Sequence, residues 1–188
     1  MQKPINYGLC KMAYAIVTET DGVLTFGTVK QLPGAIKFTR TPRGTFEQFE
    51  ADDIIYRRTN ANEGYTLSLD VYDIPTQFEI DALGMKKDAN GALIENAYDE
   101  PPRIALLGQA DGDVDKKRFV YYYCQATRPT VDSATGLKRT PQPRALVFEA
   151  DPRPDNYDVR AGLTKADDAT AYAAWFDAVY EKTEPAGG

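Results

Sequence analysis

The chain has 188 residues, of which 43% are hydrophobic and 27% charged, and its formal net charge is −6. This composition is typical of a globular protein and excludes a largely disordered chain, and the length predicts one domain over residues 1–188. The acidic balance argues against binding nucleic acid through its phosphates, which requires clustered lysine and arginine.

Chemistry-bearing residues are scarce. The sequence has no histidine, and its serines are Ser68 and Ser133. A Ser–His or Cys–His nucleophile pair and a His-bearing zinc site are therefore excluded, although carboxylate and lysine chemistry stays open. Cys10 and Cys124 lack metal or redox spacing and are expected to be reduced. No apolar run approaches the roughly 20 residues of a membrane span, and no secretory leader is expected at the N-terminus.

The first part of the chain predicts strands. Residues 12–18 and 23–29 have strand character, and Asp21-Gly22 between them indicates a hairpin turn. Pro33-Gly34 then precedes a third strand at residues 35–39.

Residues 40–64 differ in character, because strand-type residues alternate there with charges. We interpret this segment as a hairpin-like excursion that is extended but not fully part of the core. A regular alternating strand follows at residues 65–72. Pro75 and Gly84 then bracket a short helix, whose first turn tolerates the missing N–H of proline. Residues 86–102 form a polar connection with a turn at Asn90-Gly91.

The second half repeats the strand pattern at residues 103–108, 117–127 and 144–150. A C-terminal helix is predicted from about 167 to 180, because apolar residues recur there at helical spacing. We therefore expect a mainly β protein, an antiparallel β-sandwich or barrel with a short flanking helix and a C-terminal helix.

Two motifs invite functional interpretation. Residues 111–115 (Asp-Gly-Asp-Val-Asp) imitate the start of a calcium loop, but Lys116 and Tyr122 stand where an EF-hand needs glycine and glutamate. An acidic turn between strands is the favoured interpretation. Tyr121, Tyr122 and Tyr123 could form a base-stacking platform. Core packing is favoured instead, with Tyr121 and Tyr123 on one face of a strand and Tyr122 on the other, and Cys124 is expected to be buried.

A series of short motifs runs in one consistent order along nearly the whole chain. In this order the sequence resembles the major tail proteins of long-tailed bacteriophages, the tail tube subunits of the phi13-like type. The motifs are Gly8-Leu9, Tyr14-Ala15, Pro33-Gly34-Ala35, Ala51-Asp52-Asp53 with Tyr56, Gly64-Tyr65-Thr66, Pro75 with Phe78, Leu83-Gly84, Gly91 with Glu95-Asn96-Ala97, Ala105-Leu106-Leu107, residues 122–129, residues 148–154 and residues 175–180.

The resemblance implies a tail-tube fold without catalytic residues, metal or cofactor. It implies hexameric rings stacked into a tube in the virion tail, assembled from protein made in the host cytoplasm. Expected partners are other copies of the chain, the tape measure protein and further tail proteins, with no membrane. DNA is expected to pass through the lumen without specific binding, and six copies with a charge of −6 each would repel it. Tubes of contractile tails and of type VI secretion share this fold and remain an alternative.

We expect residues 40–64, and with them residues 86–102, to be mobile in the monomer and ordered between stacked rings. Charges along the exposed strands of the first segment would oppose premature pairing. The candidate self-assembly residues are Phe46, Glu47, Phe49, Glu50, Asp52, Asp53, Tyr56, Arg57 and Arg58.

Two other classes of function stay open. One is an adhesin-like or immunoglobulin-like β-module that binds a protein or a glycan, although such modules are usually exported. The other is a small β-barrel enzyme that uses carboxylates alone.

Overall fold

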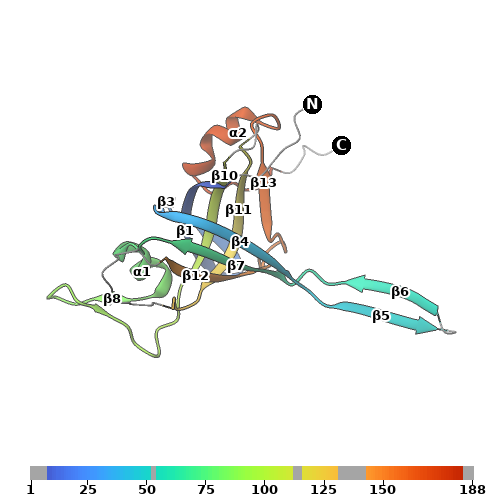
Figure 1. Cartoon of the computed structure of the whole chain (residues 1–188), viewed down its shortest axis with the longest axis horizontal. Helices are drawn as coiled ribbons and strands as arrows, with labels where there is room; N and C mark the ends of the chain where they lie inside the picture. Colours follow the sequence, from blue (N-terminus) through green and yellow to red (C-terminus); the bar gives the residue numbers. More distant parts are fainter. Residues whose placement is uncertain (1–7, 52–53, 112–115, 131–142, 184–188) are drawn as a thin grey trace, which may run out of the picture.

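The computed structural model describes residues 8–51, 54–111, 116–130 and 143–183 (Figure 1). The elements in chain order are β1 (Leu9–Thr20), β2 (Val23–Phe26), β3 (Lys30–Gln31), β4 (Ala35–Arg43), β5 (Phe46–Ala51), β6 (Ile54–Asn60), β7 (Gly64–Val71), α1 (Thr76–Leu83), β8 (Lys86–Lys87), β9 (Leu93–Ile94), β10 (Arg103–Ala110), β11 (Arg118–Ala126), β12 (Arg144–Asp151), β13 (Arg160–Leu163), α2 (Ala169–Ala173) and the 3₁₀ turn η1 (Ala174–Phe176).

Antiparallel pairing joins most strands into one sheet of the order β2-β1-β10-β11-β12-β7-β4, with β3 also on β1 and β13 also on β11. Two small ladders, β5-β6 and β8-β9, stand apart from it. The predicted mainly β, antiparallel class is confirmed. Within the described residues the end strands β2 and β4 do not pair, so the sheet is not a closed barrel.

The hairpin at the start of the sheet forms as predicted. Asp21 and Gly22 both have positive φ, 52° and 77°, which is the backbone of a type I′ turn and brings Thr20 opposite Val23. The second predicted strand, residues 23–29, is too long, however. It ends at Phe26, and a separate strand, β3, then pairs with β1 at Lys30 and Gln31.

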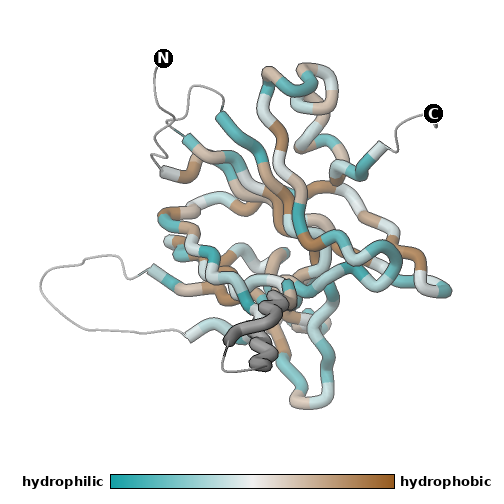
Figure 2. Tube along the Cα trace, turned by 90° about the vertical axis from the view of Figure 1, so that its right-hand side faces the viewer, coloured by the Kyte–Doolittle hydropathy of each residue, from teal (hydrophilic) through white to brown (hydrophobic). Residues whose placement is uncertain are grey.

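The sheet bends so that β4 and β7 lie over β11. Phe38 of β4 stacks on Phe119 of β11, with ring centroids 5.2 Å apart, and Tyr65 of β7 meets Tyr121 edge to face at 5.6 Å. Leucines of the central strands and Phe78 of α1 fill the space between. Figure 2 shows hydrophobic stretches running through the interior of the trace, whereas hydrophilic residues predominate on the outer loops.

The opposite face of β1, β10 and β11 is covered by the C-terminal segment. Trp175 and Val179 pack there against alanines and branched residues of the three strands, and Trp175 is 1% exposed. Trp175 also stacks on Tyr180 at 5.2 Å with the ring planes 15° apart. Residues five apart on an α-helix point in directions about 140° apart, so this stacking requires the helix to end between them.

The predicted C-terminal helix over 167–180 is therefore wrong in length. α2 covers five residues and tightens into the 3₁₀ turn η1, which ends at Phe176. The N-cap of α2 is Asp168, whose carboxylate accepts from the backbone N–H groups of Thr170 and Ala171. The helix after Pro75 matches its prediction, and Gly84 ends it with φ 74°.

The face prediction for the tyrosine run is also wrong. Tyr121 lies in the core beneath β4 and β7, whereas Tyr122 and Tyr123 both pack on the face covered by the C-terminal segment. The register explains this arrangement, because Ile104 faces Cys124 while Leu106 faces Tyr121, which places two β11 residues opposite one β10 residue. Such a bulge turns both tyrosines to one side. Cys124 is fully buried, as predicted, and Cys10 is exposed.

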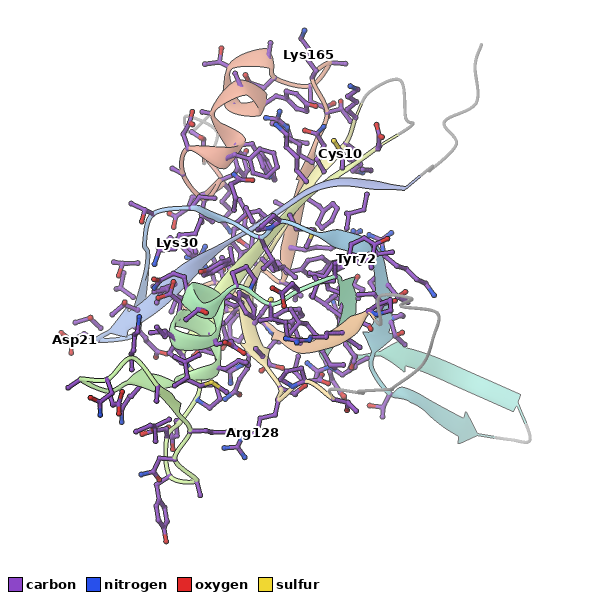
Figure 3. All side chains as sticks on the ribbon, turned by 60° about the vertical axis from the view of Figure 1, so that its left-hand side comes forward. Cys10, Asp21, Lys30, Tyr72, Arg128 and Lys165 are labelled. Atoms are coloured by element: carbon purple, nitrogen blue, oxygen red, sulfur yellow. The ribbon has the colours of Figure 1, made fainter. Side chains whose placement is uncertain are left out.

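A buried carboxylate attaches α1 to the sheet. Asp81, 8% exposed, accepts from the Tyr14 hydroxyl at 2.9 Å, from Lys30 Nζ at 2.6 Å and from Gln77 Nε2 at 2.9 Å. Burial acts to raise the pKa of Asp81, but these donors outweigh it and hold the pKa below its usual value. Figure 3 labels Lys30, which lies close to α1.

A buried guanidinium attaches the loop that follows β12 to the rest of the fold. Arg153, 5% exposed, lies 5.2 Å from the ring centroids of both Phe26 and Tyr122 and donates to both carboxylate oxygens of Asp155, at 2.8 and 2.5 Å. The loop between β12 and β13 is thereby attached to the same face as the C-terminal segment. No helix of the described residues is long and apolar enough to span a membrane.

Candidate functional site

The candidate assembly segment is a hairpin that projects from the sheet. β5 and β6 pair with each other in a ladder of their own and extend away from the bent sheet (Figure 1). Of the predicted assembly residues, β5 carries Phe46, Glu47, Phe49 and Glu50, and β6 carries Tyr56, Arg57 and Arg58; Asp52 and Asp53 lie outside the described residues.

The register of this hairpin places β6 cations opposite β5. Gln48 faces Arg58, Phe49 faces Arg57, and the register shifts between Phe49 and Glu50. A shift of this kind increases the local twist of the ribbon. In the part of the chain that the structure describes, β5 and β6 pair only with each other, so the outer edge of each strand has no partner there.

The projecting segment is shorter than the predicted 40–64. Residues 40–43 belong to β4 and pair with β7 from Arg40 opposite Leu67 to Arg43 opposite Gly64. They are part of the main sheet because β7 presents a free edge there. The hairpin departs only beyond Thr45, whose carbonyl accepts from Ala61 N–H at 3.2 Å.

A charge cluster fixes the base of the hairpin. Arg43 Nη2 donates to Asp151 Oδ1 at 2.5 Å and to the Ala150 carbonyl oxygen at 3.2 Å. Arg103 Nη1 donates to the other oxygen of Asp151 at 2.8 Å. Arg43 Nε forms an ion pair, without a hydrogen bond, with Glu149 Oε2 at 3.2 Å. Three strands that are distant in sequence are thereby joined at the point where the hairpin leaves the sheet.

The same cluster perturbs the titration of its carboxylate. Burial acts to raise the pKa of Asp151, but the hydrogen bonds from Arg43 and Arg103 outweigh it and hold the pKa below its usual value. Asp151 therefore stays charged and keeps both guanidinium groups in place at neutral pH. Sequence reasoning missed this cluster, since its members come from β4, β10 and β12 and share no local motif.

Gly64, where the chain returns from the hairpin into β7, also contacts β12 closely. Its φ is +103°, and a Cβ at this position would lie 2.0 Å from the carbonyl oxygen of Ala150. A glycine is required because the strand turns into β7 while touching the backbone of β12. The base of the hairpin is thus held to β12 by ion pairs and by close backbone contact.

A second projection is formed by residues 86–102. Its short ladder pairs Lys86 with Ile94, and the Asp88 carboxylate accepts from the backbone N–H groups of Asn90 and Ala92 in the predicted turn. Tyr98 is 94% exposed. In Figure 1 this segment lies at the end of the long axis opposite to the β5–β6 hairpin.

The described residues offer little for catalysis. They contain no group of three or more histidine, cysteine, aspartate or glutamate side chains placed to hold a metal ion. The buried carboxylate of Asp81 is saturated by its donors, and burial raises the pKa of the Cys124 thiol.

A search of curated proteins finds no match. Among solved structures, the chain is similar to one in the cryo-EM structure of the anti-feeding prophage (AFP) baseplate, 6-fold symmetrised, with 8% identity and a TM-score of 0.43 over 87% of this chain and 97% of that one. The family model described as phage tail tube protein matches residues 15–136, more than half of the sequence. This chain therefore belongs to the phage tail tube protein family and is a structural protein of a phage tail.

Proposed function

We propose that the protein is the repeating subunit of a phi13-like tail tube, in which six copies form a ring and rings stack through the β5–β6 hairpin. In this account the tube surrounds the tape measure protein during assembly and conducts DNA at ejection. The observation that carries the proposal is the family match together with a hairpin that pairs only with itself within the described residues.

The attachment of the hairpin supports a role in contact. An isolated two-stranded hairpin is only marginally stable in water, because it buries little apolar surface. Here the fold supplies the charge cluster of Arg43, Asp151 and Arg103 and the special backbone of Gly64 to aim it. These contacts at the base hold the projecting hairpin in a defined direction relative to the sheet. Such an element is expected where a second molecule must be met in one geometry.

The position of the two projections suits a repeating assembly. The β5–β6 hairpin and the 86–102 segment lie at opposite ends of the long axis (Figure 1). Contacts between unlike surfaces of identical subunits generate rings when the rotation closes and filaments when it does not. A stacked tube uses both kinds of contact, and a net charge of −6 for each copy keeps the wall repulsive to DNA.

Deleting the hairpin tests this role directly. Because the Thr45 carbonyl already bonds Ala61 N–H, residues 46–60 can be replaced by Asn-Gly to close a short turn. The variant is expected to keep the Tm of the monomer and to lose tube formation in sedimentation and electron microscopy. Tubes at the wild-type critical concentration would contradict the proposal.

Hydrogen exchange on free and assembled protein gives a second test. Protection of residues 46–60 is expected to rise on assembly, whereas β11 (Arg118–Ala126) is already in the centre of the sheet and should not change. The amides of residues 40–43 that bond to β7 should be protected in both states. Equal protection of residues 46–60 before and after assembly would contradict a role in stacking.

A further inference from the structure

A basic cavity opens between two strands that are not neighbours in the sheet. It has a volume of about 710 Å³ and lies between β4 and β13. Lys37 and Arg40 of β4, Arg160 of β13 and the adjacent Lys117 line it, together with Phe38 and Phe119, and its described lining includes no carboxylate. In a chain with net charge −6, four cations around an aromatic floor are an unusual concentration.

Within the described residues, the two arginines of this group lack an ion-pair partner, unlike several other arginines of the fold. Arg43, Arg103, Arg128, Arg144 and Arg153 each form an ion pair with a carboxylate. A sixth arginine, Arg118, donates to the side chain of Gln109. By contrast, neither Arg40 nor Arg160 has a hydrogen bond or ion pair there, and the nearest aromatic contact of Arg160 is Tyr65 at 5.8 Å. Among the described residues, no carboxylate forms an ion pair with either arginine of the cavity.

The walls also present unpaired backbone. Within the described residues β4 pairs only with β7, and β13 pairs only with β11, so each strand keeps one edge open. Open edges accept an added strand through main-chain hydrogen bonds. The occupant that fits is thus an extended, acidic segment with an open edge of its own.

From these features, and resting on the proposed function, we infer that the cavity receives β5 of a second copy of the chain. Among the described strands with an open edge, β5 is the acidic one, because Glu47 and Glu50 are its charged residues. The sequence continues with the acidic Asp52 and Asp53. The cations of β6, Arg57 and Arg58, lie on the other strand of the hairpin. Basic β4 and β13 therefore complement the acidic edge of a neighbouring hairpin.

Reciprocal charge reversal tests the pairing. The double variant Arg40→Glu and Arg160→Glu and the double variant Glu47→Lys and Glu50→Lys are each expected to raise the critical concentration for assembly at least about tenfold. Mixing the two variants should restore assembly, because each reversed hairpin then meets a reversed cavity. The control Lys165→Glu reverses a cation outside the cavity and should assemble as wild type.

The possible outcomes separate the docking of β5 from the proposed function. Normal assembly of the Arg40 and Arg160 variant, or failure of the mixture to recover, would overturn the docking of β5. A drop in the Tm of the isolated Arg40 and Arg160 variant without recovery in the mixture would also overturn it, and would assign the cations to the stability of the monomer. Failure of the wild-type chain itself to assemble would contradict the proposed function instead.

Discussion

Replacing Gly64 by alanine is expected to destabilise the fold far more than the same change at Gly22. Both residues have positive φ, 103° and 77°, which alanine adopts at a cost of about 1 kcal/mol or more. At Gly22 an added Cβ meets nothing within 4 Å, so the conformational cost is the whole effect. At Gly64 the Cβ would lie 2.0 Å from the carbonyl oxygen of Ala150, in the backbone of a paired strand.

Relief of that contact must separate β7 from β12 where Tyr65 faces Ala150. Losing one or two ladder hydrogen bonds and adopting strained backbone adds about 2–4 kcal/mol. The total for Gly64→Ala is then about 3–5 kcal/mol, against about 1 kcal/mol for Gly22→Ala. In a domain of this size, the loss expected for Gly64→Ala lowers Tm by roughly 10 °C.

Urea unfolding followed by circular dichroism and by the fluorescence of buried Trp175 measures both variants. The expected result is a difference in unfolding free energy of at least about 2 kcal/mol between them. Equal stabilities, within about 0.5 kcal/mol, would refute the claim that backbone contact with β12 makes Gly64 necessary.

Two further predictions concern buried charges. Because the folded pKa of Asp81 is below its usual value, its stabilisation is present above pH 4 and is lost as pH falls through the folded pKa. Asp81→Asn should therefore cost about 1–3 kcal/mol at pH 7, and thermal unfolding should show the difference from wild type shrinking below about pH 4. Arg153→Lys should cost about 2 kcal/mol in urea unfolding, since lysine cannot both stack and donate in a fork. Arg144→Lys should change stability by under about 0.5 kcal/mol, because its partner Asp73 is 81% exposed, and an equal loss in both variants would contradict this account.

Local patterns predict much of the fold. The Asp21-Gly22 turn, the helix between Pro75 and Gly84 and the strands around residues 65–72, 103–108 and 144–150 are all present. Each of these depends on backbone preferences or alternation within a few residues. β13 was not predicted, because its four residues, Arg160–Leu163, are too short to show a period.

Features that depend on pairing between distant strands escape such analysis. The bulge that turns Tyr123 to the same face as Tyr122 arises from the register between β10 and β11. The stacking of Trp175 on Tyr180, which ends the C-terminal helix, depends on the face that receives it.

Part of the candidate site, too, is predicted by local patterns, and part depends on pairing between distant strands. The change in charge pattern after residue 40 predicts a projecting hairpin, and the structure has one at residues 46–60. Its base was not predicted, since Arg43 meets Asp151 only after β4, β7 and β12 have paired. The basic cavity is likewise visible only in three dimensions, because Arg40 and Arg160 are 120 positions apart in the sequence and line one cavity.

Electron microscopy of the purified protein at increasing concentration tests the central claim most directly. We expect six-fold rings and stacks of rings for the wild-type chain, and folded single subunits for the variant that lacks residues 46–60. A wild-type chain that stays monomeric at every concentration, even with its tail-assembly partners present, would contradict it.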